Sequence, residues 1–215
     1  MIKRIAVSAL FLIMLSSSIY AYSISDSGGY MSLSGGTDLG WSIGDDGIRS
    51  NYATIGVDFV CYICKYIGLS YGAGLNVPFS VYYHNEKAEN KTSFIPIEVA
   101  LRASMIGRYP ISDKASICAR LGLVFYGGKC RYSSDSYTGI DGPVKRTTER
   151  MDVALGLFSE HSFSESFCFI AGVDVLFPVY AAIRESGIAT SSSRKSSYDY
   201  KRYGVYPYIG FALFA

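Results

Sequence analysis

The sequence predicts an all-β protein, an eight-stranded antiparallel up-and-down transmembrane β-barrel. Three observations support this class. Large apolar residues alternate with small or polar ones in eight separate runs, long polar connections alternate with short ones, and a secretory leader precedes the first run. A period of two residues is typical of strands with two unlike faces. The fold class therefore follows from patterning alone.

Residues 1–21 are predicted to be a cleaved signal peptide. Lys3 and Arg4 form a positive n-region, residues 5–15 are apolar, and a cleavage site with small residues ends at Ala21. The apolar stretch is shorter than the ~20 residues that a membrane-spanning helix needs. Residues 22–28 are expected to be a periplasmic N-terminal segment, and residues 29–215 an outer-membrane β-barrel.

Eight strands are expected after the leader, each long enough to cross a bilayer at a tilt. In chain order they are residues 29–44, 51–61, 66–83, 93–105, 115–129, 149–158, 167–183 and 203–214. Proline cannot donate a hydrogen bond to a sheet, so prolines inside these ranges are expected near strand ends or barrel rims. They are Pro78, Pro96, Pro178 and Pro207.

The polar faces of these strands favour a membrane barrel. In residues 66–83, Leu69 and Leu75 share the apolar parity, whereas Gly68, Ser70 and Gly74 share the other. A face exposed to water would carry Lys, Glu, Thr or Gln, so glycine and serine indicate a crowded polar interior with lipid outside. The alternative is a soluble eight-stranded barrel of the lipocalin kind, with its apolar face turned inward around a ligand.

The connections between the expected strands alternate in length. The outer ones are expected at residues 45–50, 84–92, 130–148 and 184–199. The inner ones are expected at residues 62–65, 106–114 and 159–165. Short inner turns with long outer loops are typical of outer-membrane barrels, and an even strand number leaves both termini on the inner side.

This architecture resembles the small eight-stranded outer-membrane barrels of the OmpW, OmpX and OmpA-barrel kind over residues 29–215. Such barrels usually end in an aromatic residue that the assembly machinery recognises, and here Phe214 is penultimate. The composition, rich in serine, glycine and tyrosine, resembles that of spirochaetal outer-membrane proteins. The resemblance implies localisation in a bacterial outer membrane, with outer-membrane lipid and the lipid-assembly machinery as partners.

Charged residues on the polar parity are expected to form a network in the lumen. An unpaired charge in a low-dielectric interior is costly, so these carboxylates and arginines should pair with one another. A lumen of eight strands holds little beyond its own side chains or one small ligand, so the network is interpreted either as lumen filling or as a gate. Its expected members are Asp38, Asp58, Glu98, Arg102, Arg120, Asp152 and Asp174.

The expected function is non-enzymatic. The resemblance to OmpW-type barrels implies passage of small hydrophobic solutes, or a porin-like role, through an outer vestibule lined by Tyr126, Leu176 and Tyr180. The first alternative is an adhesin or structural envelope protein that binds a host surface ligand through its loops. The second is a lipid-modifying barrel enzyme that uses His84 or His161.

Cofactors and nucleic acid are not expected. The net charge is only +2, without a long basic run. Cys61 and Cys64 have redox-type spacing but fall on a short turn rather than at a helix start, where a thiolate would be activated. Cys118 and Cys168 are expected inside the barrel as small filling residues on strands that are not neighbours.

Overall fold

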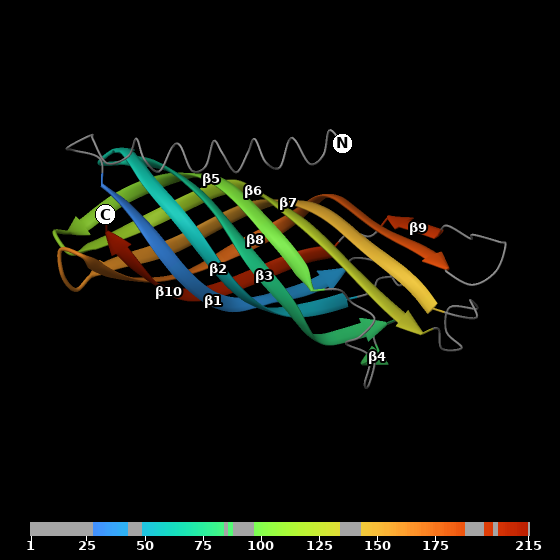
Figure 1. The fold of residues 1–215 in the computed structure, drawn as a ribbon. Helices are drawn as coiled ribbons and strands as arrows, with labels where there is room; N and C mark the ends of the chain where they lie inside the picture. Colours follow the sequence, from blue (N-terminus) through green and yellow to red (C-terminus); the bar gives the residue numbers. More distant parts are fainter. Residues whose placement is uncertain are drawn as a thin grey trace, which may run out of the picture.

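The structure is a computed structural model of the chain. It describes residues 28–42, 49–83, 86–87, 97–133, 143–187, 196–199 and 202–214. The predicted signal peptide, residues 1–21, and all but the last residue of the 22–28 segment lie outside these ranges. The described residues form one elongated barrel of tilted strands (Figure 1).

Ten strands make up this barrel and its extensions. They are β1 (Gly29–Ser42), β2 (Arg49–Cys64), β3 (Ile67–Tyr83), β4 (Glu86–Lys87), β5 (Glu98–Ser112), β6 (Ala115–Ser133), β7 (Pro143–Ser162), β8 (Phe167–Gly187), β9 (Ser196–Asp199) and β10 (Arg202–Phe214). All of the pairings are antiparallel.

The barrel closes because β10 pairs with both β1 and β8. The closed ring contains β1, β2, β3, β5, β6, β7, β8 and β10, each bonded to the next in the chain, while β4 and β9 extend β3 and β8. Closure leaves the ring without an open sheet edge. The predicted eight-stranded, antiparallel, up-and-down barrel is therefore confirmed.

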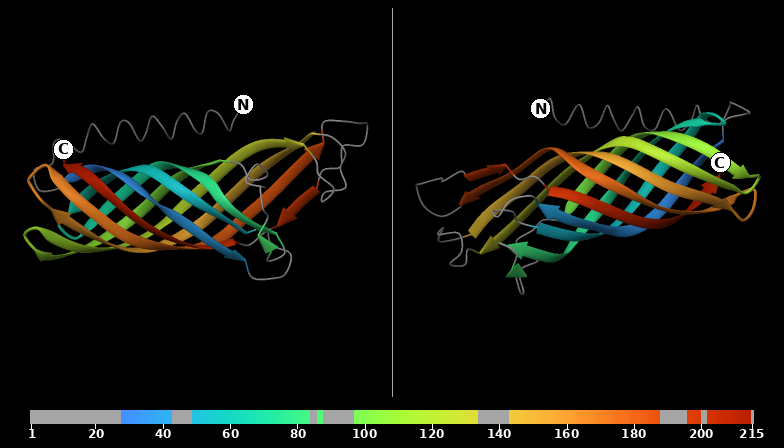
Figure 2. Two further views of the ribbon diagram at one scale, coloured as in Figure 1. Left: turned by 90° about the horizontal axis from the view of Figure 1, so that it is seen from below. Right: turned by 180° about the vertical axis from the view of Figure 1, so that it is seen from behind.

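The two ends of the barrel differ in their connections. Tight turns at residues 65–66, 113–114 and 163–166 define what we call the turn end. The opposite end, called the loop end, carries β4 and β9 (Figures 1 and 2). The C-terminus lies at the turn end (Figure 2).

Several strands are longer than predicted. β5 continues to Ser112, so most of the expected inner turn at residues 106–114 is strand. β6 and β7 pair as far as Ser133 and Pro143, so much of the expected outer loop at residues 130–148 belongs to these two strands. The alternation of apolar residues ends earlier than the strands do. Backbone hydrogen bonds continue a hairpin without needing an apolar face.

Burial alternates along the strands with the parity that the sequence predicts. Small and polar side chains face inward, whereas aliphatic side chains such as Leu33, Leu157 and Ile209 are 55–60% exposed on the outside. Exposing such side chains to water would forfeit about 25 cal/mol per Å² of apolar surface. The exterior is thus the band that a barrel presents to lipid. No described helix is long and apolar enough to cross a membrane.

Prolines and bulges interrupt the pattern locally. Register shifts occur where β2 pairs with β3 at Pro78 and where β7 pairs with β8 at Pro178. Pro207 lies mid-strand rather than near a rim, so the expectation for this residue is wrong. The β1–β10 register passes from Tyr208 to Val205 without a partner at Pro207, which has no N–H to donate.

Candidate functional site: the ion-paired lumen

The middle of the lumen contains a row of three residues on adjacent strands. Asp58 of β2 lies opposite Gly72 of β3, which lies opposite Arg102 of β5. The guanidinium Nη1 of Arg102 donates to Asp58 Oδ2 across the glycine at 3.4 Å. Arg102 also lies over the ring of Tyr206, 5.3 Å from its centroid. A carboxylate and an arginine two strands apart therefore meet over a glycine.

A second row repeats this arrangement on the other side of the barrel. Arg120 of β6 lies opposite Gly156 of β7, which lies opposite Asp174 of β8. Arg120 Nη2 donates to Asp174 and also to the hydroxyl of Tyr208, the latter at 2.9 Å. Both charged residues are buried, so each row is a desolvated ion pair.

The glycines of these rows have a steric role. A Cβ atom on Gly72 would collide with the carboxylate of Asp58, and one on Gly156 would collide with that of Asp174. The alternation of glycine with aliphatic residues therefore supplies both the outer band and the interior space that long charged side chains need.

A larger cluster lies toward the loop end. Arg202 is fully buried, and its two Nη atoms donate to both carboxylate oxygens of Asp38 at 2.9 Å each. Its Nε and Nη2 also donate to the carbonyl oxygen of Ser50, at 3.0 and 2.8 Å. A bidentate pair of this kind is strong and geometrically specific. Gly40 leaves the space for it, since a Cβ there would meet the guanidinium.

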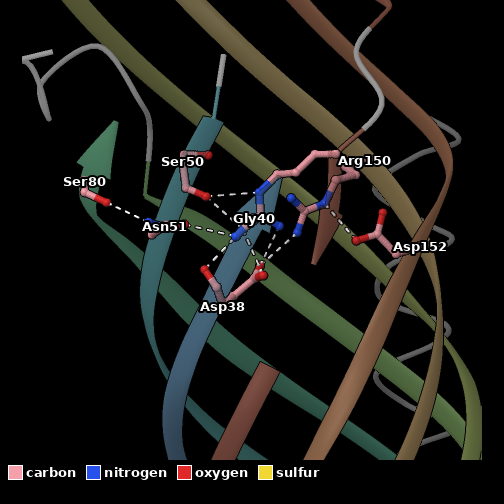
Figure 3. Close-up of polar contacts among 8 residues, drawn as sticks. Asp38, Gly40, Ser50, Asn51, Ser80, Arg150 and Asp152 are labelled. Carbon is pink, nitrogen blue, oxygen red and sulfur yellow. Dashed lines mark hydrogen bonds and ion pairs between the residues drawn. The ribbon is translucent and has the colours of Figure 1, made fainter. Parts of the chain in front are cut away.

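Arg150 extends the loop-end cluster to β7. Its Nη2 donates to Asp38 Oδ2 at 3.3 Å, and its Nε lies 3.1 Å from Asp152 Oδ2. The guanidinium carbon is 3.7 Å from the ring centroid of Tyr126, a close cation–π contact. Figure 3 shows Asp38, Arg150 and Asp152 directed toward one another.

A third cluster closes the turn end. Tyr30 donates its hydroxyl to Glu160 Oε1 at 2.7 Å, and the Tyr62 hydroxyl donates to the same oxygen. Arg108 Nε lies 3.0 Å from Glu160 Oε2, and the guanidinium sits over the Tyr62 ring at 4.6 Å. The Tyr62 hydroxyl also contacts Cys118 Sγ at 3.7 Å. Buried Glu160 thus has a donor or a cation at each oxygen.

The turn-end cluster and the two middle rows leave little free space between them. A cavity of about 20 Å³ lies between the turn-end cluster and the middle rows, bordered by Tyr30, Asp58, Arg120, Phe158 and Tyr208. A cavity of this size holds roughly one water molecule. The middle of the described lumen is therefore filled by its own side chains.

Solved structures share this architecture. The outer membrane protein OprG from Pseudomonas aeruginosa superposes with a TM-score of 0.56 at 14% identity, over 88% of this chain and 97% of that one. The fold is that of the small outer-membrane barrels. A major outer membrane protein from Thermus thermophilus has the same fold, with a TM-score of 0.56 at 10% identity over 88% of this chain and 99% of that one. The outer membrane protein AlkL, solved in lipid bilayers, has it too, with a TM-score of 0.52 at 11% identity over 90% of this chain and 92% of that one. No protein-family model and no curated protein matches the sequence.

All seven charged residues predicted for the lumen of this outer-membrane-type barrel face inward and are buried. They belong to separate groups rather than to one network. The pairs Asp58–Arg102 and Asp174–Arg120 fill the middle, whereas Asp38 and Asp152 join the loop-end cluster. Glu98 does not pair with Arg102 or Arg120, because it stands four residues nearer the loop end on β5 than Arg102.

Sequence reasoning missed four charged residues of the lumen: Arg108, Arg150, Glu160 and Arg202. Arg150 and Glu160 share the parity of Asp152 on β7, and Arg108 shares that of Arg102 on β5. A signal was therefore present. The signal lay in the alternate positions that carry polar residues, because these positions continue along the strands after the apolar residues between them have ended.

The predicted vestibule is only partly formed. Leu176 and Tyr126 face inward and are buried, but the Tyr126 ring is covered by Arg150. Tyr180 is 45% exposed on the outer face, so the prediction that it lines the lumen is wrong. The cause is the bulge in β8. Asp152 pairs with Pro178 but Met151 with Tyr180, and the extra residue between them reverses the parity.

Four cysteines have described side chains, all of them free thiols. Cys118 and Cys168 are fully buried on β6 and β8, and Cys61 and Cys64 are free thiols at the turn end. No group of three His, Cys, Asp or Glu residues suited to a metal occurs in the part of the chain that is described. His161 is exposed and packs edge-on against Phe163. His84 lies outside the described residues.

Proposed function

We propose that this protein is a bacterial outer-membrane barrel that acts without catalysis and works at its loop end, as a scaffold for surface recognition. The observation that carries the proposal is an apolar exterior around a lumen filled by ion pairs. Such a tube is suited to lipid on the outside and offers no open path inside. The fold shared with outer-membrane barrels supports the localisation.

The filled lumen argues against free diffusion through the barrel. A solute crossing it would have to separate the Asp58–Arg102 and Arg120–Asp174 pairs, both of them buried. Separating a buried pair costs about 3–5 kcal/mol. A barrel built this way serves more readily as a rigid anchor than as an open pore.

The long strands at the loop end favour recognition. The β6–β7 hairpin stays paired to Ser133 and Pro143, and β7 and β8 stay paired to Val144 and Gly187. These hairpins hold the connections at residues 134–142 and 188–195 on a paired base. Loops carried on a rigid scaffold commonly bear binding sites, here for a ligand on a host or matrix surface.

A second candidate is gated passage of small solutes. Buried polar atoms without a hydrogen-bond partner gather in the loop-end half of the described lumen, including Ser50 Oγ, Thr148 Oγ1 and both carboxylate oxygens of Asp152. Such atoms favour water or a polar solute in the mouth of the barrel. The hydrophobic version of this function is less well supported, because Tyr180 faces outward and Arg150 covers Tyr126.

Fractionation tests the localisation. The chain should partition with the outer membrane and change its gel mobility on boiling, as a folded barrel does. A chain that stays soluble without detergent would contradict the proposal.

Loop exchange separates the two candidates. Replacing residues 134–142 and 188–195 with short linkers should abolish binding to host or matrix surfaces while leaving the heat-dependent gel shift intact. In lipid bilayers the unaltered chain should show no steady conductance. Conductance or solute uptake that survives the loop exchange would favour passage over recognition.

A further inference from the structure

The charges inside the described lumen do not balance. Six carboxylates are buried there: Asp38, Asp58, Glu98, Asp152, Glu160 and Asp174. Every one except Glu98 has an arginine nitrogen within 3.4 Å, and five arginines provide these contacts: Arg102, Arg108, Arg120, Arg150 and Arg202. Glu98 is the carboxylate that remains.

Glu98 is 2% exposed, and its Oε2 accepts no hydrogen bond from any residue that the structure describes. An isolated buried carboxylate is strongly unfavourable unless a cation or hydrogen-bond donors compensate it. Arg150 stands two residues along β7 from Thr148, and its ion pairs are with Asp38 and Asp152 rather than with Glu98, although its Nη1 makes no hydrogen bond. Glu98 therefore has no ion pair with a described arginine, and Arg150 attracts it only from a longer distance.

The surroundings of Glu98 repeat the pattern of the two middle rows. Glu98 of β5 lies opposite Gly128 of β6, which lies opposite Thr148 of β7. In the rows that contain Gly72 and Gly156, an arginine stands across the glycine from the carboxylate. In this third row the corresponding residue is a threonine.

Thr148 supplies an acceptor in place of a guanidinium. It is 6% exposed, and its Oγ1 also makes no hydrogen bond within the described ranges. On the other side of Glu98 lies Asn76 of β3, 2% exposed, whose neutral amide has an oxygen acceptor and two N–H donors but no charge to balance the carboxylate. Carboxylate, hydroxyl and amide oxygens thus stand in one register row with no cationic side chain among them.

We propose that this row binds a singly charged cationic group from outside the barrel, a protonated amine or guanidine, in the place that arginine takes in the other two rows. N–H donors of the ligand would satisfy Glu98 and Thr148 together, and one positive charge would neutralise the site. Glu98 is the first residue of β5 and lies on the loop-end side of the middle pairs, so a ligand that enters from the loop end would not have to separate those pairs. The site is independent of whether any solute crosses the barrel.

The test uses the full chain folded in detergent micelles, with methylguanidinium, ethylammonium or sodium chloride as probes. Tetramethylammonium chloride at equal ionic strength is the control, since it carries the same charge without N–H donors. The midpoint of thermal unfolding should rise with methylguanidinium and ethylammonium above the control, as binding to the folded state requires. A rise with sodium alone would assign the site to a metal ion and overturn the organic-cation proposal.

Variants test the assignment to this row. Glu98→Gln should weaken probe binding at least about ten-fold, since it removes a hydrogen bond to a charged group. Thr148→Arg should place an internal guanidinium across Gly128, abolish the response to the probes and raise the starting midpoint. Glu149→Gln, one residue along β7 on the opposite face, should keep the full response.

Two results would overturn the proposal. One is a probe response in Glu98→Gln equal to that of the unaltered chain. The other is no response to any organic cation. In that case we expect an infrared band of a protonated carboxylic acid that Glu98→Gln removes. That band would show that Glu98 is neutral and needs no ligand. Loss of the loop functions above would leave each of these readouts unchanged.

Discussion

The turn end and the loop end of the lumen meet the same requirement, burial of charge, in different ways. At the turn end, Glu160 receives two tyrosine hydroxyls and Arg108, so its oxygens have partners from three strands. At the loop end, Arg150 is shared between Asp38 and Asp152, both Asp152 oxygens lack hydrogen bonds, and Glu98 has no arginine. Glu160 Oε2 makes no hydrogen bond either, but it is ion-paired with Arg108, so the charges of the turn end are better satisfied than those of the loop end.

This difference indicates where the barrel can respond to its surroundings. A fully hydrogen-bonded polar network is rigid and specifies one arrangement, whereas unsatisfied buried groups favour water, a ligand or a rearrangement. The loop end is also the end at which β4 and β9 extend beyond the ring. Recognition and ligand binding are therefore expected there, and the turn end is expected to serve stability.

The largest effect is expected from Arg202→Met at the loop end. It leaves Asp38 buried with only the 3.3 Å contact to Arg150. Breaking a buried pair should lower the free energy of unfolding by about 3–5 kcal/mol. Urea unfolding in lipid vesicles, followed by fluorescence of the single tryptophan, measures this.

Arg108→Met is the matched change at the turn end. The Arg108 side chain is 26% exposed and the two tyrosines still donate to Glu160. Arg108→Met should therefore lower the free energy of unfolding clearly less than Arg202→Met does. A larger loss for Arg108→Met than for Arg202→Met would contradict the comparison between the two ends.

A smaller effect is expected from Gly72→Ala in the middle of the lumen. The new methyl group would collide with the Asp58 carboxylate and disturb its pair with Arg102. Overpacking of this kind should lower stability by about 1–3 kcal/mol, measured by the same urea unfolding. Gly107→Ala is the control, because a Cβ there meets nothing within 4 Å. Equal effects of the two changes would disprove the steric role of Gly72.

The smallest effect is expected from Tyr62→Phe, which removes one of the two hydroxyl donors to Glu160. Tyr30 still donates to the same oxygen, so the loss should be about 1 kcal/mol. Tyr126→Phe is the comparison at the loop end. The contribution of Tyr126 is its ring under Arg150, which phenylalanine preserves, so stability should hardly change. A greater loss for Tyr126→Phe would place an important hydroxyl contact at the loop end.

Much of the barrel could be predicted from local pattern. Aliphatic residues alternate with glycine and serine along the strands. In the structure Leu69 and Leu75 are exposed on the outer face, whereas Gly74 is buried on the inner face. The inward position of the seven predicted charges followed from the same parity. Strand ends were predicted less well, because hairpin pairing at β6 and β7 continues beyond the apolar residues.

The sequence by itself determined which side chains face lipid and which face the lumen, because alternation is a local property of an extended chain. Only the tertiary structure decided which charges meet. Arg202 reaches Asp38 across 164 residues of sequence, because closure through β10 brings these positions together. A one-residue bulge turned Tyr180 outward, and register alone left a threonine opposite Glu98 where two other rows have arginine. Pairing register and closure are non-local, so no window of sequence contains them.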